Sequence, residues 1–510
     1  MPYVRCALRP FAITLGPVVL LLLAALAPDR AAAESLLAGA AKVDITDRQA
    51  GPVNDPLYAK ALVLKSGDTQ AVFITIDAVA IGEIGRIGAD FLPTVRSGLE
   101  EDLGIAPANV LANASHCHGV VRHDVAQLTI QAVLAAAKNL TPVRVGVGIG
   151  REDRIMENRR LKLKSGRTID VRHAYALPPD DEVAEVGPID PEIGILRLDR
   201  EDGSTLAVVY NFACHPIQGV PGGANTADLV GYASNVIEEN LGPGTIALFL
   251  QGCGGDINPI DYKDVDHPRS AEPLGNRLGL SALRALRKIE CTSDSRLQLL
   301  NETLALPRGD RSARIAELES QQERLLNSLQ GTSLNLKTFL PLVVKYNLSS
   351  EFPSYYSHRY LHDDALGRRE LRDLDKENRL NLRAYMRNIH TMEELTRLRT
   401  NLALLRKHQA SLVDSGKRTV DVEIMAVRVG DFSLLTFPGE LTVEIGLNLK
   451  RRSPQQRTFV AGYTNGYIYY APTAEQLQNV GGAQEDSDCI LAPAWQELFE
   501  DKAIEMLERL

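Results

Sequence analysis

Two kinds of hydrophobic pattern alternate between residue 34 and about residue 300. Short continuous runs of Val, Ile and Leu are typical of strands buried on both faces, and between them lie amphipathic stretches with helical spacing. The runs predict strands at residues 71–76, 110–112, 143–149, 193–198, 206–212 and 245–250. The amphipathic stretches predict helices, for example at residues 125–139 and 229–240. This alternation indicates an α/β fold.

The pattern changes between residues 308 and 415. Apolar residues recur there at heptad spacing, interrupted at Gln322, while Arg, Glu, Gln and Lys fill the other positions. Such spacing predicts a helical insertion made of two long antiparallel helices. The segment 339–360 between them is aromatic, and Pro341 and Pro353 break any long helix there. Two interpretations stay open: a packing or dimerisation arm, which we favour, and a cap over a binding cleft. The repeating positions are Ile315, Leu318, Leu325, Leu329, Leu395, Leu398, Leu402 and Leu405.

Strand-like runs return after the insertion. They predict strands at residues 422–429, 433–437 and 457–462, followed by an amphipathic helix over residues 495–510. The insertion therefore interrupts one domain, which we place at residues 34–510. The expected fold is α/β, with a mixed multi-stranded sheet core, flanking helices and a helical insertion at residues 308–415.

The first 33 residues have the pattern of a signal peptide. Arg5 and Arg9 form a positive start, residues 13–26 are apolar, and residues 31–33 are three alanines typical of a cleavage site. The alternative is an uncleaved membrane anchor, but the apolar run is short for a membrane span. We therefore expect a periplasmic or secreted protein.

Charge and cysteine content narrow the classes of function. The chain has a net charge of -9, so it lacks the general electrostatic attraction that nucleic-acid-binding proteins use, and no nucleic-acid partner is expected. Five cysteines lie beyond residue 33, which is an odd number, and none belongs to a CxxC pair. A disulfide scaffold is therefore excluded, and any metal site must use mainly His and carboxylate ligands.

Polar residues follow directly after several predicted strands. Four such loops occur, at residues 113–118, 213–216, 251–258 and 438–440. In an open α/β sheet, ligands bind beyond the carboxyl ends of the strands. If these strands are parallel, the four loops share one rim of the sheet.

These loops contain the residue types of a catalytic zinc site. His116 and His118 are two residues apart, His215 follows a strand, and Glu440 follows a Pro-Gly turn. Two histidines, one carboxylate and an open position are a usual arrangement for catalytic zinc. Taken alone, each histidine motif more often contains hydrogen-bonded histidines than metal ligands. The loop at residues 252–258 lacks the Lys-Ser/Thr of a phosphate-binding loop, so nucleotide binding is rejected, and its glycines are expected to permit close backbone approach.

Asp256 has three candidate roles. Its carboxylate could bind the metal, orient a histidine ligand, or cap the next helix. Capping and orientation are equally compatible with the sequence.

In these motifs the sequence resembles the neutral/alkaline non-lysosomal ceramidase family. The match includes Asn-Ala-Ser-His-Cys-His, Asn-Phe-Ala-Cys-His-Pro, Gly-Asp-Ile-Asn-Pro, Pro-Gly-Glu and Asn-Gly-Tyr, in the family's order. The order of the motifs is far more specific than any one of them. The matching segments are residues 40–46, 55–61, 113–118, 158–159, 187–192, 211–216, 255–259, 438–440 and 465–467.

The resemblance implies a set of site residues. It implies a catalytic Zn²⁺ held by His116, His215, Glu440 and Tyr467, with His118, Arg159 and Tyr470 lining the pocket. One position departs from the family: Asn258 stands where the ceramidases have a serine, which excludes a serine acyl-enzyme there but not a metal-activated water. His118 or Asp256 is expected to carry the proton to the leaving amine.

The expected function is that of an exported zinc-dependent hydrolase of an amide (N-acyl) bond, similar to the ceramidases. Its partner would be a small-molecule or lipid amide, which also allows peripheral contact with a membrane. Two alternatives stay open: a zinc esterase or amidase acting on a sugar- or peptidoglycan-derived substrate, and a non-catalytic exported binding protein. The sequence does not indicate the oligomeric state.

Overall fold

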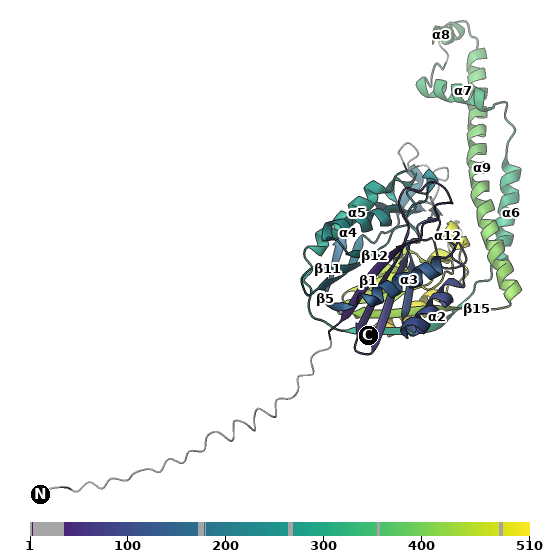
Figure 1. Cartoon of the computed structure of the whole chain (residues 1–510). Coiled ribbons are helices and arrows are strands. Elements are labelled where there is room, and N and C mark those ends of the chain that lie inside the picture. The colour runs from purple at the N-terminus through teal and green to yellow at the C-terminus, as the bar shows by residue number, and fades with distance from the viewer. Residues whose placement is uncertain are drawn as a thin grey trace.

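The computed structural model describes residues 35–171, 180–263, 269–353, 357–478 and 483–510, together with residues 3 and 178. The predicted signal peptide lies outside these residues, apart from Tyr3. The structure confirms the predicted α/β fold with its mixed sheet, its flanking helices and its helical insertion (Figure 1).

The larger sheet has eight strands in the order β12-β11-β10-β5-β1-β2-β3-β4. All six strands predicted before residue 300 belong to it. Its edge pairs β3–β4 and β11–β12 are parallel, whereas the five pairings between β3 and β11 are antiparallel. In chain order the strands are β1 (Leu37–Asp44), β2 (Tyr58–Ser66), β3 (Thr69–Ile76), β4 (Val110–Ala114), β5 (Thr141–Arg151), β10 (Glu192–Arg200), β11 (Thr205–Phe212) and β12 (Ile246–Gln251).

A four-stranded sheet packs face to face against the larger one. Its order is β14-β15-β16-β18, and it contains the three strands predicted after the insertion. Alternate residues of both sheets meet in one core, for example Leu62 and Leu248 with Met425 and Phe459. The sheets approach so closely that a Cβ at Gly194 would lie 2.1 Å from the ring of Phe459. The strands are β14 (Leu297–Pro307), β15 (Thr419–Val429), β16 (Phe432–Thr436) and β18 (Thr458–Ala461).

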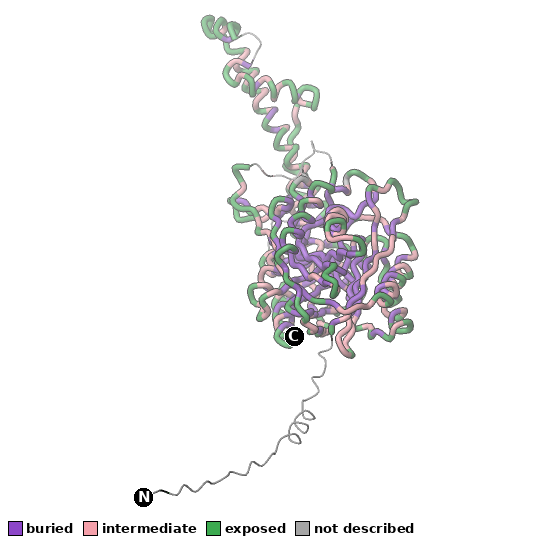
Figure 2. The backbone as a smooth tube through the Cα atoms, turned by 60° about the vertical axis from the view of Figure 1, so that its left-hand side comes forward, coloured by how far each residue is buried: buried purple, intermediate pink, exposed green. Residues whose placement is uncertain are grey.

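Helices cover the two outer faces and complete a four-layer arrangement. On the larger sheet, α2 and α3 pack over strands β1 to β4, and α4 and α5 pack over β10 to β12. On the smaller sheet, α10 and α13 bury Ile445, Leu449, Trp495 and Phe499. Buried residues are concentrated in this body of the protein (Figure 2). The helices are α2 (Phe91–Leu103), α3 (Val125–Lys138), α4 (Asp228–Leu241), α5 (Glu272–Leu286), α10 (Val443–Arg452) and α13 (Trp495–Glu508).

The expectation that all the loop-bearing strands are parallel is wrong. Because five antiparallel pairings separate β3 from β11, strands β4 and β11 have opposite senses in the sheet. The two edges of the sheet nonetheless lie close together, because the sheet curls until β12 contacts β3 and β4. The Gln251 N–H at the end of β12 donates to Asn113 Oδ1 on β4, at 3.0 Å. Curling of the sheet, rather than parallel pairing, therefore brings these loops together.

Short elements connect the two sheets around the site. Strand β6 pairs with β13, β17 pairs with β19, and β7, β8 and β9 form a small separate sheet. Two short helices, α11 and α12, precede the last part of the chain. The bounds are β6 (Met156–Asn158), β7 (Arg160–Leu163), β8 (Thr168–Asp170), β9 (Val183–Val186), β13 (Ile257–Pro259), β17 (Glu440–Leu441), β19 (Tyr470–Ala471), α11 (Ala474–Leu477) and α12 (Gln484–Ser487).

The helical insertion forms an arm that projects from the body (Figure 1). It consists of α6 (Ser312–Ser328), α7 (Leu336–Leu348), α8 (Ser357–Ala365) and α9 (Glu370–Ser415). Helices α6 and α9 pack through Leu318, Leu398, Leu402 and Leu405, four of the heptad positions. Of the two long helices predicted, α9 has 46 residues and α6 has 17.

The connection between α6 and α9 is itself helical. Pro341 lies inside α7, whose 13 residues begin at a capping box formed by Asn335 and Thr338. The prediction that Pro341 breaks a helix is therefore wrong, because α7 continues through it, whereas Pro353 lies between α7 and α8 as expected. Among the described helices of the whole chain, none is both long and apolar enough to cross a membrane.

Candidate metal centre

His116 is held in an unusual backbone conformation just beyond β4. Its φ is +67°, a region that residues other than glycine rarely adopt and that is often found at functional sites. The His116 N–H donates to Ala78 O at 2.9 Å. The ring places Nδ1 2.6 Å from Val79 O, so Nδ1 carries the proton and donates it to that carbonyl.

His215 is fixed in the same way beyond β11. Its N–H donates to Ile257 O at 3.0 Å, and its Nδ1 lies 3.1 Å from the same carbonyl oxygen. Glu440 begins β17, and its N–H donates to Tyr469 O at 2.9 Å. A Cβ at Gly255 would lie 2.7 Å from Glu440 O, so glycine is required for this close approach, as the sequence predicted.

The free ring nitrogens of both histidines point at one carboxylate. His215 Nε2 lies 3.1 Å and His116 Nε2 lies 3.6 Å from Glu440 Oε2. Both Nδ1 atoms donate to carbonyls, so both Nε2 atoms are hydrogen-bond acceptors, as is the carboxylate oxygen. Three acceptors whose ligand atoms all lie within 4.8 Å of one another repel each other unless a cation lies between them. His–carbonyl contacts of this kind are the usual means of orienting a metal-binding imidazole.

The electrostatics suit a cation as well. Burial lowers the pKa of His116 to about 4, so its imidazole is neutral at pH 7 and can bind a metal. Burial opposes ionisation of Glu440, but His116, His215 and the Tyr467 hydroxyl hold the pKa of this carboxyl well below its usual range. Glu440 therefore presents a negative charge, and His116 presents a neutral nitrogen.

Two tyrosines donate hydrogen bonds to Glu440. The Tyr467 hydroxyl donates to Oε1, and the Tyr463 hydroxyl donates to Oε2 at 3.0 Å. The Tyr463 ring also lies 4.3 Å from the ring of His116, measured between centroids. Positive φ values of 52° to 66° at Tyr463, Asn465 and Tyr469 show that this loop is held in a strained conformation. Tyr467 is therefore beside the candidate metal ligands, in the position that the family resemblance implies.

The sequence identified Tyr467 but not Tyr463. From the sequence, the tyrosines of this segment formed a cluster that is more often used for packing. Only the position of the Tyr463 hydroxyl distinguishes its role, and no spacing in the sequence reveals that position.

Arg159 lies fully buried next to the candidate ligands. It forms an ion pair with Glu485, and its Nη2 donates to Gly255 O at 2.6 Å and to the Tyr470 hydroxyl at 3.2 Å. Its charge adds to the causes that lower the pKa of His116, so the guanidinium lies within electrostatic range of the ligands. Tyr470 pairs with Glu440 in the β17–β19 ladder. Arg159 and Tyr470 thus form a donor pair beside the metal group.

Asn258 belongs to the same buried group. Its Oδ1 accepts from Arg159 Nη1 at 3.0 Å. Its Nδ2 has no hydrogen-bond partner among the described residues. At the position where the ceramidases have a serine, this chain therefore has an amide side chain whose N–H donor is not used by the described residues.

Asp256 contacts residues other than the candidate metal ligands. Its Oδ1 accepts from the Val443 N–H at 2.8 Å, at the first turn of α10, and its Oδ2 accepts from Asn158 at 3.3 Å. Arg160 Nε is 3.7 Å from the same carboxylate. These contacts favour the capping role for Asp256, although the capped helix is distant in the sequence rather than the next one.

His118 lies at the outer edge of the site. Unlike His116 it is exposed, and the two ring centroids are 5.6 Å apart. Desolvation of its ring and the neighbouring His116 lower the pKa of His118 to about 4, so its imidazole is neutral at pH 7 and can accept a proton. This placement suits the proton-transfer role suggested for it.

A polar cavity of about 750 Å³ opens beside this group. Its lining includes Asn158, Arg160, Asp256, Lys162 and Glu444. Arg159, between Asn158 and Arg160 in the sequence, instead points to Asn258 and Tyr470. Alternation along this extended segment thus directs neighbouring side chains into two adjacent spaces.

The three cysteines next to the motifs are not ligands. Cys117, Cys214 and Cys253 are buried and unpaired in the structure. Burial raises the pKa of the Cys117 and Cys214 thiols well above their usual value, so both are protonated at pH 7. They act as small buried apolar residues.

Replacing Tyr463 by phenylalanine tests its role as a positioning residue. The substitution removes one hydrogen bond to Glu440, and we expect metal affinity to fall roughly 10–100-fold. The free energy of unfolding is expected to fall by only about 1 kcal/mol. Metal affinity is measured by competition with a chelating dye.

Tyr210→Phe is the matched control. The Tyr210 hydroxyl is also buried, and it donates to Val230 O at 3.0 Å, away from the candidate ligands. This variant should lose similar stability and keep the metal affinity of the original protein. Equal affinity in the Tyr463→Phe variant would contradict the positioning role.

Comparison with known proteins agrees with the motif resemblance at the level of fold. No protein-family model matches the chain. A solved structure described as a ceramidase complexed with C2 aligns with a TM-score of 0.59 and 17% identity, over 94% of this chain and 76% of that one. The neutral ceramidase of Pseudomonas aeruginosa aligns with a TM-score of 0.57 and 16% identity, over 94% of this chain and 75% of that one. The chain therefore has the fold of these ceramidases, at a low sequence identity.

Proposed function

We propose that this chain is a metal-dependent hydrolase of an amide (N-acyl) bond, with zinc held by His116, His215, Glu440 and Tyr467. One observation supports this most strongly: three buried acceptor atoms converge within 4.8 Å. Two imidazoles and a carboxylate are the donor set of many catalytic zinc sites. Keeping such groups buried without a cation between them would be costly.

The residues around this group fit hydrolysis of an acyl bond. A zinc ion in this site would supply Lewis acidity, which lowers the pKa of a water molecule and polarises a carbonyl group. Arg159 and Tyr470 present an N–H and an O–H on the same side of the site, where they can donate to the carbonyl oxygen as it gains negative charge. Arg159 stays ionised because burial is outweighed by Glu485, so the pKa of this guanidinium is raised further.

Proton transfer is the proposed task of His118. It is exposed next to His116, so it can deliver a proton to a leaving nitrogen and exchange it with solvent. Asp256 is less suited to that task, because its carboxylate is occupied by Val443, Asn158 and Arg160. Asn258 excludes a serine acyl-enzyme at its position. Its Nδ2 has no hydrogen-bond partner among the described residues, and donation from this atom to the substrate is its proposed role.

A lipid amide is the proposed substrate class. Two solved structures with this fold are named ceramidases, and a ceramide is an N-acylated lipid. The sequence pattern of residues 1–33 supports export, which would place the enzyme in the periplasm or outside the cell.

The polar cavity favours a second substrate class. Its lining by Arg160, Lys162 and Glu444 suits hydroxyl and charged groups better than an acyl chain. An N-acylated sugar, or another polar amide, is therefore the alternative substrate.

Metal content and turnover, measured on the same purified protein, test the proposal. Elemental mass spectrometry should find one zinc ion per chain. The protein should hydrolyse a fluorescent N-acylsphingosine, and this activity should be lost when a chelator is added and restored when zinc is added back. Zinc with turnover only of N-acyl sugars would select the second substrate class. A protein that binds no metal would refute the site, and zinc without hydrolysis of any amide or ester would favour a binding protein.

A further inference from the structure

Helix α7 is apolar on two faces, and only one of them is covered. Phe339 and Tyr346 pack against Leu382 and Tyr385 of α9. The opposite face carries Leu336, Leu340, Val344 and Leu348, which follow one another at intervals of four residues. Their exposed fractions are 61%, 53%, 56% and 83%. Residues at this spacing form a continuous stripe along a helix, so an apolar strip faces away from the arm.

The charges near this strip are basic. Lys337 and Lys345 are the only charged residues of α7, and both border the strip. From residue 336 to residue 387 the sequence has ten Lys and Arg against seven Asp and Glu, in a chain whose net charge is -9. An apolar strip bordered by lysines is typical of helices that lie in the interface of an anionic bilayer.

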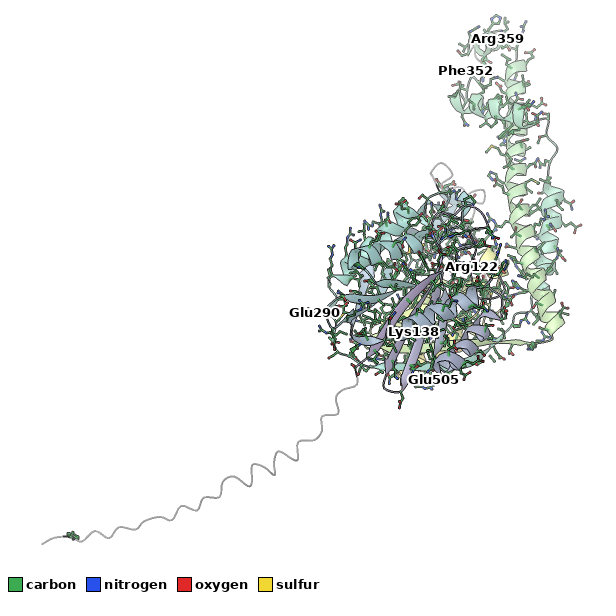
Figure 3. The ribbon with its side chains drawn as sticks, in the orientation of Figure 1. Arg122, Lys138, Glu290, Phe352, Arg359 and Glu505 are labelled. Atoms are coloured by element: carbon green, nitrogen blue, oxygen red, sulfur yellow. The ribbon has the colours of Figure 1, made fainter. Side chains whose placement is uncertain are left out.

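The strip lies far from the body of the protein. Helix α9, with 46 residues, is about 70 Å long at 1.5 Å per residue, and α7 and α8 lie at its outer end (Figure 1). Phe352 and Arg359 mark the same end of the arm (Figure 3). A strip in this position can contact a flat surface without interference from the body.

The strip is too small for a stable contact with a second copy of the chain. A helix of 13 residues is about 20 Å long and about 10 Å wide, so one face of it covers roughly 200 Å². A stable protein interface buries roughly 800 Å² on each partner. A bilayer contact needs no such area, because burial of a few apolar side chains and attraction of lysines to anionic headgroups both contribute to the binding free energy.

We propose that the end of the arm docks on an anionic lipid bilayer through the exposed strip of α7. Leu336, Leu340, Val344 and Leu348 enter the interface, and Lys337 and Lys345 contact the headgroups. The proposal rests on the proposed function only for the idea that the substrate is drawn from that bilayer. Docking is measured without turnover, so failure of one proposal is distinguishable from failure of the other.

Co-sedimentation of the full chain with vesicles tests the docking. Vesicles of phosphatidylcholine and phosphatidylglycerol in equal amounts should bind the protein at least about tenfold more tightly than vesicles of phosphatidylcholine alone. The double variant Leu340→Glu and Val344→Glu should lose this binding. The variant Lys337→Glu and Lys345→Glu should lose the preference for phosphatidylglycerol, and added salt should have the same effect on the original protein.

A matched control is available on the same arm. Leu326 of α6 and Val413 of α9 are also exposed apolar residues, at 53% and 68%, but lie outside α7. The variant Leu326→Glu and Val413→Glu should bind vesicles as the original protein does. Circular dichroism checks that all variants keep their helices.

A fluorescence measurement gives an independent readout. The chain has one tryptophan, Trp495, which is fully buried in the core. In a Leu340→Trp variant, the second tryptophan should shift its emission to shorter wavelength when anionic vesicles are added. The proposal would be overturned by absence of this shift, or by vesicle binding of the Leu340→Glu and Val344→Glu variant that equals that of the Leu326→Glu and Val413→Glu control. A dimer that the Leu340→Glu and Val344→Glu variant dissociates would also overturn it.

Discussion

Replacing His215 by alanine is expected to abolish both metal binding and hydrolysis. His215 Nε2 lies 3.1 Å from Glu440 Oε2, and its removal takes one of two neutral nitrogens from the proposed ligand set. The loss in kcat/KM should be on the order of a thousand-fold or more, because the metal supplies most of the chemistry in such a site. Metal content and turnover are measured on the same preparation.

His408→Ala is the matched control for this substitution. His408 is also a buried histidine, but its Nε2 pairs with Asp488 at 2.7 Å and it is not one of the three converging residues. The control variant should keep one metal ion per chain. If the His215→Ala variant bound no metal and still hydrolysed the substrate at the original rate, a metal-dependent mechanism would have to be abandoned.

Replacing Arg159 by methionine is expected to lower both stability and activity. Arg159 and Glu485 are both fully buried, and removing the cation takes away the nearest positive charge of the Glu485 carboxylate. Loss of one partner of a buried ion pair typically costs about 3–5 kcal/mol. The variant also loses a donor beside Tyr470, which should lower kcat by roughly 100- to 1,000-fold.

A double variant separates the two effects of Arg159. Arg159→Met combined with Glu485→Met removes both charges, and it should recover much of the lost stability without recovering activity. Arg48→Met is the control for an exposed pair, because Arg48 and Asp44 are 63% and 40% exposed, and it should change stability by at most about 1 kcal/mol. Chemical denaturation measures all three. Full activity in the double variant would show that Arg159 serves only the fold.

The strands could be predicted from the sequence because burial on both faces leaves a simple signature. In β11 all eight residues are buried, and the run Val208-Val209-Tyr210 is apolar throughout. The second sheet and the pairing directions could not be predicted in the same way. Apolar runs carry no information on strand sense, so the parallel rim was an assumption that the five antiparallel pairings overturned.

The three converging ligands could also be predicted, because each stands in a distinctive motif next to a strand end. Their geometry depends on groups that carry no such signal. The carbonyl oxygens of Val79 and Ile257 fix the two imidazoles, and any residue type supplies a carbonyl. The three roles considered for Asp256 could not be separated either, because the N–H that it accepts belongs to Val443, 187 residues away.

The arm replaces the turn of a β-hairpin. Strands β14 and β15 pair from Leu297↔Val429 to Pro307↔Thr419, and the Arg308 N–H donates to Arg418 O at 2.9 Å just beyond the ladder. Joining two strands through about 110 unstructured residues costs about 3 kcal/mol more in loop-closure entropy than joining them through four. Helices α6 and α9 remove most of this cost once they pair, since they return the chain to its starting point. We therefore expect the arm to fold before β14 and β15 form their hydrogen-bonded pair. Glu440 and Tyr467 lie beyond β15 in the chain, whereas His116 and His215 lie before β14. We therefore expect the two pairs of proposed ligands to come together only after this local helical hairpin has folded.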